Sequence, residues 1–225
     1  MLEALYDNLI AEDRWQYIVD GLITTLQITF FAVIIGIVLG FIVAIIRATY
    51  ERTHKLKILN ALCQVYLTVF RGTPVVVQLL IMYYVIFISV KSKLLVASLA
   101  FGINSGAYVA EIIRGGIQSI DEGQFEGGSS LGFNYTQTMI YIILPQVLKN
   151  VLPSLANEFI VLLKETSVSG YIAMQDLTKG GDIIRSQTYN AMVPLFIVAA
   201  IYLAMVMLFS YLIRILERRL RNSER

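Results

Sequence analysis

The segment from Asp121 to Gln146 reads DEGQFEGGSSLGFNYTQTMIYIILPQ and interrupts a chain that is otherwise mostly apolar. Its first half is polar and rich in glycine. A loop of this kind is out of place in a bundle of membrane-spanning helices unless another protein docks on it. We therefore expect spanning helices on both sides of this segment and a docking surface within it.

The composition on both sides is that of a membrane protein. Of the 225 residues, 57% are hydrophobic and only 15% are charged, whereas soluble domains carry about 25% charged residues. Segments without any charged residue are Thr24–Ile46, Gly72–Val90, Leu94–Ala110 and Ala191–Ile213. Runs of roughly 18 or more apolar residues are long enough to cross a bilayer. The fold class predicted is an all-α, polytopic membrane helix bundle in one domain, residues 1–225.

Five transmembrane helices are predicted, at about residues 22–46, 60–90, 94–113, 147–163 and 191–213. The fourth helix is less apolar than the others. A loop at about 114–138, with a flanking helix to residue 146, separates the third helix from the fourth. The segment 164–190 is expected to lie outside the membrane or to fold back into it.

Charged residues at the ends of the apolar segments predict the orientation. The chain before the first span is acidic, cations follow that span from Arg47 onward, and the tail after Arg214 is strongly basic. Cytoplasmic loops of membrane proteins carry an excess of Lys and Arg. The N-terminus is therefore predicted outside, and the loop 114–138 and the C-terminus in the cytoplasm. The basic turn Lys91–Lys93, placed outside, is mildly against this rule.

The residues needed for catalysis or metal binding are scarce. One cysteine, Cys63, and one histidine, His54, form neither a disulfide nor a metal-site pattern. We expect Cys63 to pack between helices and His54 to belong to a basic loop. The phosphate-binding pattern GxxxxGK(S/T) does not occur. A membrane enzyme is therefore disfavoured, and a channel or scaffold would not need the docking loop. Nothing indicates a nucleic-acid partner.

Polar residues inside predicted spans indicate a cavity. Asn104, Tyr108 and Glu111 follow an i, i+4, i+7 spacing and share one helix face. Such residues within a span usually face protein or water. In the alternative interpretation, Glu111 lies near the lipid headgroups and pairs with Arg114. Asn157, near the middle of the fourth span, is also expected to reach a central cavity.

Two further patterns concern the helices themselves. The spacings Gly36-x-x-x-Gly40 and Gly102-x-x-x-Gly106 favour close helix packing in lipid. The sequence Arg71–Pro74 breaks the second span, because proline removes a backbone donor and clashes with the preceding turn. Either the break lines a cavity, or it joins a cytoplasmic helix to a spanning one.

The docking segment resembles the coupling loop of the permease subunits of ABC importers. The matching residues are Glu126-Gly127-Gly128, Gly132 and Leu144-Pro145. Other segments, in the same order as in the polar amino-acid permeases of this class, are Phe70–Pro74 with Gln78, Asn104–Glu111, Arg114–Ile117, Asn157–Ile160, Leu163–Ser167 and Glu217–Arg219. The resemblance covers roughly residues 15–221 and implies the type I importer fold.

The resemblance also implies partners, a location and roles. Two permease subunits, the second a copy or a homologue, would form a pathway in the bacterial cytoplasmic membrane for a polar or charged L-amino acid. Two cytoplasmic ATPases would bind ATP and Mg, and an extracytoplasmic amino-acid-binding protein would deliver the substrate. The chain itself would have no cofactor and no ATPase activity. The residues expected along the substrate pathway are Thr73, Gln78, Asn104, Tyr108, Glu111 and Asn157.

The chain departs from the permease pattern at two points. Gly127 and Gly128 stand where these permeases usually have alanine, and the turn after the second span is short. Within the loop, we expect Glu126 at or near the N-terminal end of a docking helix, where the helix dipole favours a carboxylate. Gly132 is expected in a tight turn, where a side chain would clash or force an unfavourable backbone.

Overall fold

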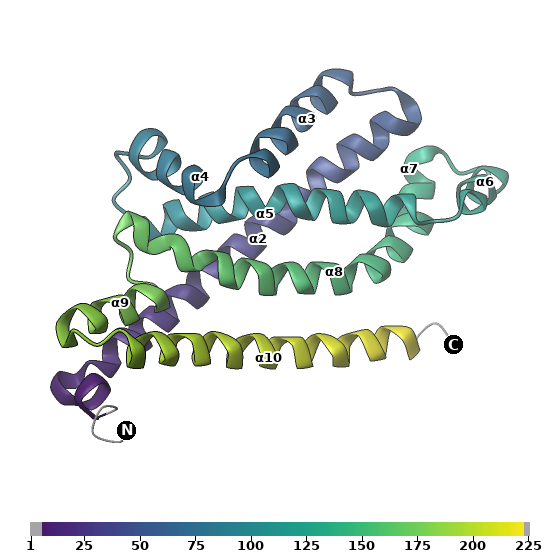
Figure 1. Ribbon diagram of the computed structural model, residues 1–225. Helices are drawn as coiled ribbons and strands as arrows, with labels where there is room; N and C mark the ends of the chain where they lie inside the picture. The colour runs from purple at the N-terminus through teal and green to yellow at the C-terminus, as the bar shows by residue number, and fades with distance from the viewer. Residues whose placement is uncertain (1–5, 223–225) are drawn as a thin grey trace.

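The computed structural model describes residues 6–222, so the two ends of the predicted domain, 1–5 and 223–225, lie outside it. Within the described range all regular structure is helical (Figure 1). The longer helices are α2 (Trp15–Thr53), α3 (Lys57–Gly72), α5 (Lys93–Gln118), α8 (Leu144–Glu165), α9 (Leu177–Thr188) and α10 (Met192–Asn222). The shorter ones are η1 (Tyr6–Ile10), η2 (Ala11–Asp13), α4 (Val75–Ile81), η3 (Met82–Ile86), α6 (Glu122–Ser130), α7 (Tyr135–Thr138), η4 (Met139–Ile143) and η5 (Thr166–Ile172).

The predicted fold class, a polytopic membrane helix bundle, is confirmed. Within residues 6–222, four stretches are long and apolar enough to cross a membrane, namely Trp15–Thr53, Lys93–Gln118, Tyr135–Ile172 and Met192–Arg219. A bent pair, Lys57–Gly72 with Val75–Ile86, makes a fifth if it is taken as one span. Where the bilayer begins and ends along these helices stays a prediction.

Helices α2 and α5 form the centre of the bundle through small residues. A Cβ atom at Gly40 would lie 2.9 Å from the backbone nitrogen of Ala110, and one at Gly102 would lie 3.1 Å from the carbonyl oxygen of Ala32. Gly36 also faces α5. These contacts need glycine, because a side chain would push the two backbones apart. The helix packing favoured by the glycine spacing is thus present, and it lies between the first and third predicted spans.

The second predicted span is broken where the sequence indicates. Thr73 and Pro74 have extended backbones, and the helices on either side meet at a bend of 110°. The Thr73 hydroxyl donates to the carbonyl of Val69, which closes the end of α3. The break therefore turns the chain sharply instead of kinking one straight helix.

The segment 164–190 packs against the N-terminal part of α2. The backbone nitrogen of Leu177 donates to the Thr25 hydroxyl over 3.1 Å, and Gly180 lies in direct contact with the Tyr17 carbonyl. Asp176 caps α9 by accepting from the first backbone N–H groups of that helix. α9 and η1 thus lie at one end of the bundle (Figure 1). The opposite end carries α6, α7 and the C-terminal ends of α2 and α10.

The two residues expected to have no chemical role are placed accordingly. Cys63 is buried and packs with Val43, Leu67 and Ala107 between α2, α3 and α5. His54 is exposed in the short connection between α2 and α3, where it ends α2 with a left-handed backbone.

Candidate functional site

The docking segment folds into two short helices whose ends are set by local sequence. Asp121 caps α6 by accepting from the backbone N–H of Gly123. At the other end, the N–H of Gly132 bonds to the carbonyl of Ser129 and that of Phe133 bonds to the carbonyl of Gly128. This pair of bonds is the Schellman arrangement, which needs a left-handed residue. Gly132 supplies it with φ of 82°.

The second short helix, α7, is fixed by a capping box. The Asn134 side chain accepts from the backbone N–H of Gln137, while the Gln137 side chain accepts from the backbone N–H of Asn134. Both ends of the turn between α6 and α7 are therefore closed by hydrogen bonds within the chain. The result is a preformed helix–turn–helix at one end of the bundle.

One expectation about this segment needs correction, and of the two alternatives given for Gly132 the structure supports the second, the unfavourable backbone. Glu126 is the fifth residue of α6, so Asp121 and Glu122, and not Glu126, occupy the N-terminal end where the dipole acts. At Gly132 a Cβ would meet nothing within 4 Å, so no clash arises there. The constraint at Gly132 is its positive φ alone, which a residue with a side chain adopts only at a cost.

The two glycines that replace alanine differ from each other. Gly127 is exposed, and a Cβ there would meet nothing within 4 Å. Gly128 is buried, and a Cβ there would lie 2.6 Å from both Oγ1 and Cγ2 of Thr138. Only Gly128 is therefore required, because it lets α6 approach α7 closely.

Leu144 and Pro145 begin α8, directly after the π-helical turn η4. Proline cannot donate a backbone hydrogen bond, and its ring crowds the carbonyl four residues earlier. A wider turn before Pro145 relieves that crowding. Their predicted role in the coupling loop stays a prediction, as it does for Glu126, Gly127, Gly128 and Gly132.

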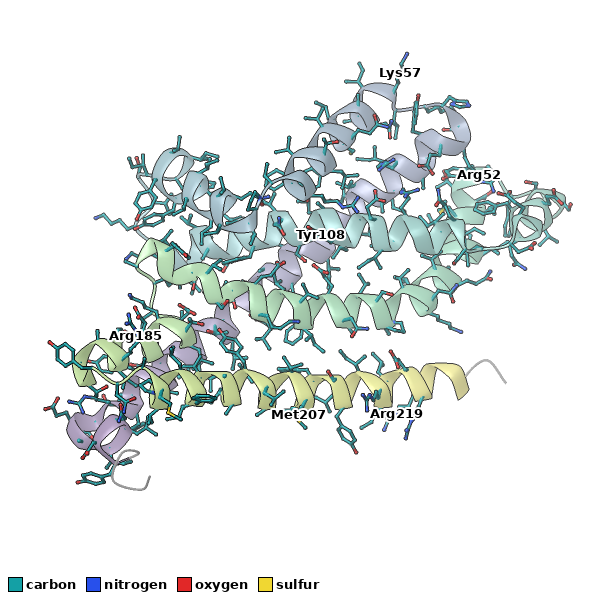
Figure 2. All side chains as sticks on the ribbon, viewed as in Figure 1. Arg52, Lys57, Tyr108, Arg185, Met207 and Arg219 are labelled. Atoms are coloured by element: carbon teal, nitrogen blue, oxygen red, sulfur yellow. The ribbon has the colours of Figure 1, made fainter. Side chains whose placement is uncertain are left out.

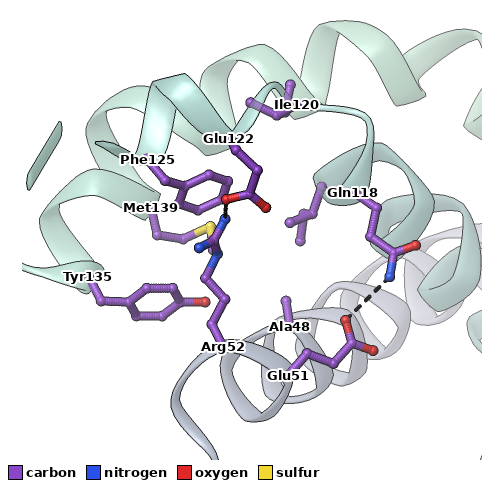
Figure 3. Close-up of a pocket in the computed structure, with 10 residues that line it drawn as sticks. Ala48, Glu51, Arg52, Gln118, Ile120, Glu122, Phe125, Tyr135 and Met139 are labelled. Carbon is purple, nitrogen blue, oxygen red and sulfur yellow. Dashed lines mark hydrogen bonds and ion pairs between the residues drawn. The ribbon is translucent and has the colours of Figure 1, made fainter. Parts of the chain in front are cut away.

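The end of α2 holds α6 in place across a cavity of about 400 Å³ (Figure 3). Arg52 forms an ion pair with Glu122, and its guanidinium carbon lies 3.7 Å from the centre of the Phe125 ring. Tyr135 and Met139 line the same cavity. This contact could not be predicted from the sequence, because 70 residues separate Arg52 from Glu122.

A second cavity, of about 760 Å³, lies between α2, α3 and α5. Glu111 lines it and accepts from Arg114 at 2.8 Å and from Arg47 at 2.9 Å. Arg71 approaches Glu111 to 3.9 Å and lies over the Tyr108 ring, 5.7 Å from its centre. Glu111 therefore pairs with Arg114 and also faces a cavity, while its depth in the membrane and its role in the pathway stay predictions.

Three of the other expected pathway residues, Thr73, Gln78 and Asn104, form a separate hydrogen-bonded network, in which Gln78 and Asn104 are buried and Thr73 is exposed. Asn104 donates to the side-chain oxygen of Gln78 over 2.9 Å, and Gln78 donates to the Thr73 hydroxyl over 2.9 Å. Both Asn104 and Gln78 also donate to the carbonyl of Phe70, which the helix break leaves free. The network stabilises the bend at Pro74, and its three residues do not line the second cavity.

Asn157 is exposed on α8 and does not line either cavity. Its neighbour Glu158 points inward and accepts from the Ser105 hydroxyl over 3.0 Å. The sequence could have indicated Glu158 as well as Asn157, because a carboxylate near the centre of a predicted span usually faces protein or water.

The apolar bundle, the preformed helix pair at one end and the polar cavities between helices together define a membrane transport component. Comparison with known proteins places the chain within one family. It belongs to the binding-protein-dependent transport system inner membrane components, whose pattern matches residues 36–222. The chain is thus a multi-pass inner-membrane permease subunit, and ATP hydrolysis is the task of a separate subunit.

Individual relatives agree with this assignment. The chain is 39% identical to a putative glutamine transport system permease protein of Rickettsia felis, covering 91% of this chain and 93% of that one. It is 34% identical to an arginine transport system permease protein of Bacillus subtilis, covering 92% and 94%. A crystal structure of an amino acid ABC transporter with histidines matches with a TM-score of 0.83 at 43% identity, covering 91% of this chain and 94% of that chain. The expected importer permease fold is confirmed.

Proposed function

We propose that this chain forms the membrane pathway for a polar L-amino acid in an ATP-driven importer. Its partners would be a second permease, a pair of cytoplasmic ATPases that bind ATP and Mg, and an extracytoplasmic amino-acid-binding protein. The observation that carries the proposal is the α6–α7 pair, which is capped at each end and joined to α2 by Arg52. The names of the relatives, which refer to glutamine and arginine, support the substrate class.

The second cavity supports a finer choice of substrate. It is lined by three arginines and one glutamate, so its net charge is about 3 − 1 = +2. A cavity of one sign attracts groups of the opposite sign. The half-exposed guanidinium of Arg71 suits the α-carboxylate of an amino acid, and Glu111 suits the ammonium. An uncharged or acidic side chain is then favoured over a basic one.

The remaining expected pathway residues would act around this cavity. Asn104, Gln78 and Thr73 hold the helix break in place, and Tyr108 forms part of the cavity wall. Asn157, on the exposed face of α8, would reach the pathway only where a second permease subunit packs against that face. This would place it between the two subunits.

Uptake by the reconstituted complex tests the proposal. Proteoliposomes with the permease, its ATPase and its binding protein should accumulate radiolabelled L-glutamine only with ATP inside. Excess unlabelled glutamine should compete, and L-arginine should compete less well. Absence of ATP-dependent uptake of any amino acid would contradict the function, whereas stronger competition by arginine would contradict only the choice of side chain.

Glu111→Gln tests the role of the cavity. Loss of the anion removes the partner of the ammonium and leaves Arg47 and Arg114 facing each other. We expect the half-saturation concentration for uptake to rise about tenfold or more, since about 1.4 kcal/mol corresponds to a factor of ten. Cys63→Ser, at a buried position that does not itself line the cavity, is the control. Wild-type half-saturation in Glu111→Gln would leave Glu111 as a structural partner of Arg114 only.

A further inference from the structure

Helix α6 is small, and few of its side chains attach it to the bundle. Of its nine residues only Phe125 and Gly128 are buried. Gly128 contacts α7, and Gln124 accepts from Gln146 at the start of α8 over 3.2 Å. The third attachment runs to α2, through Phe125 and Glu122. It is the only one of these three that reaches a helix far from α6 in the sequence.

Arg52 makes this third attachment with one planar group. Its edge pairs with the Glu122 carboxylate, and its face lies over the Phe125 ring at 3.7 Å (Figure 3). A guanidinium can do both at once, whereas an ammonium group cannot. We name this three-residue contact, Arg52 with Glu122 and Phe125, the Arg52 clasp. Both charged side chains are substantially exposed, so the ion pair contributes little to stability.

The helix that carries Arg52 is continuous from one end of the bundle to the other. α2 has 39 residues and no break. Near its C-terminal end Arg47 pairs with Glu111 of α5, so α2 also flanks the second cavity. Near its N-terminal end Thr25 accepts from Leu177 at the start of α9. A displacement of the C-terminal end of α2 would therefore change the contacts of α2 at the second cavity and at α9.

We propose that the Arg52 clasp is a positioning contact that makes α2 move together with α6 when the ATPase partner moves α6. The inference rests on the proposed function, because it assigns α2 a part in the coupling of ATP hydrolysis to import. Without the clasp, α6 would still be attached to α7 and α8, so the ATPase would still dock. Its movement would then reach α2 only indirectly, through α5, which precedes α6 in the chain and packs along α2.

Arg52→Gln in the reconstituted complex tests the proposal. We expect ATP hydrolysis to persist while uptake per ATP falls by about fivefold or more, the lower end of typical coupling between two sites. Lys57→Gln is the matched control, because it removes the same charge from an exposed position at the same end of the molecule. Wild-type coupling in Arg52→Gln would overturn the proposal, as would an equal loss of coupling in Lys57→Gln.

The charge swap Arg52→Glu with Glu122→Arg separates pairing from folding. Each single change should lower uptake per ATP, and the double variant should recover part of it. If the double variant shows no recovery of uptake per ATP, while it and the two single variants are present in the membrane at wild-type amounts, the proposed role of the Arg52 clasp is contradicted. If the wild-type complex itself imports no amino acid, the proposed function fails and not merely the clasp.

A chemical cross-link between α2 and α6 provides a second test, which can be used if the charge-changed variants fold poorly. In a Cys63→Ser background, Arg52→Cys and Glu122→Cys can be joined by a short bifunctional maleimide. Because α2 and α6 are proposed to move as one body, the linked complex should transport more per ATP than the unlinked one. Unchanged or lower coupling after linking would show that the two helices must separate during the cycle and would overturn the proposal.

Discussion

At the scale of single residues, the adjacent glycines of α6 look alike in the sequence but differ in whether the structure has room for a Cβ atom. The sequence showed only that Gly127 and Gly128 both stand where these permeases usually have alanine. The structure gives them different surroundings, with open space at Gly127 and the side chain of Thr138 at Gly128. Sequence reasoning could not distinguish them, because the contact partner lies ten residues further on, beyond the turn at Gly132.

This difference yields a prediction. Gly128→Ala should lower the stability of the complex by about 1–3 kcal/mol, the usual cost of overpacking. Gly127→Ala should be neutral or stabilising by up to about 1 kcal/mol, because alanine favours helix over glycine. Thermal unfolding of the purified complex measures both. Adding Thr138→Ala should restore the stability lost in Gly128→Ala, because it removes the side-chain atoms that the new Cβ would meet. If stability is not restored, the steric conflict does not lie with Thr138.

At the scale of helices, periodicity and composition predicted the existence of the long helices and the break at Pro74. The glycine spacing favoured close helix packing, but it did not predict that the first and third apolar segments pack against each other. The angle at the break was beyond sequence reasoning, because the bend of 110° depends on the network around Gln78 and Asn104. The Asp121 cap was readable from the sequence, and overlooking it displaced the expected start of α6 toward Glu126.

The α2–α5 contact can be tested with one substitution at two sites. At Gly40 a new Cβ would meet Val109 and the backbone of Ala110, and a backbone cannot yield easily. At Gly115, on the exposed face of the same α5, it would meet nothing within 4 Å. Gly40→Ala should therefore lower the amount of folded protein in the membrane several-fold, as overpacking of about 1–3 kcal/mol would do. Gly115→Ala should not. Similar amounts of both variants would contradict this account of the interface.

At the scale of the whole molecule, the sequence predicted a helix bundle with a docking segment. The bundle is found, with α6 and α7 at one end, while the docking role stays a prediction. The sequence did not predict which helices that segment touches. The charges that decide this, Arg52 and Glu122, lie far apart in the chain and read as ordinary surface residues. The second cavity was predicted only in part. Of its arginines, Arg47 was used for orientation alone, and Arg114 was used as a partner for Glu111 and in the family resemblance.

The predicted orientation can be tested in spheroplasts with a membrane-impermeant maleimide. In a Cys63→Ser background, Lys91→Cys should react in intact spheroplasts, because the turn before α5 is predicted outside. Lys57→Cys should react only after permeabilisation, because the α2–α3 connection is predicted in the cytoplasm. Both positions are exposed. The reverse labelling pattern would invert the topology and remove α6 from the cytoplasm.

The caps at both ends of the α6–α7 turn have a thermodynamic consequence for assembly. A loop that becomes ordered only on binding spends part of its interaction energy on lost conformational freedom. Here the Gly132 turn and the capping box of Asn134 and Gln137 fix the backbone within the isolated chain. The entropy of ordering is then lost during folding of the permease and not at each encounter with the partner. Association of the ATPase should therefore resemble the docking of two rigid bodies, with little change in backbone protection of α6 on binding.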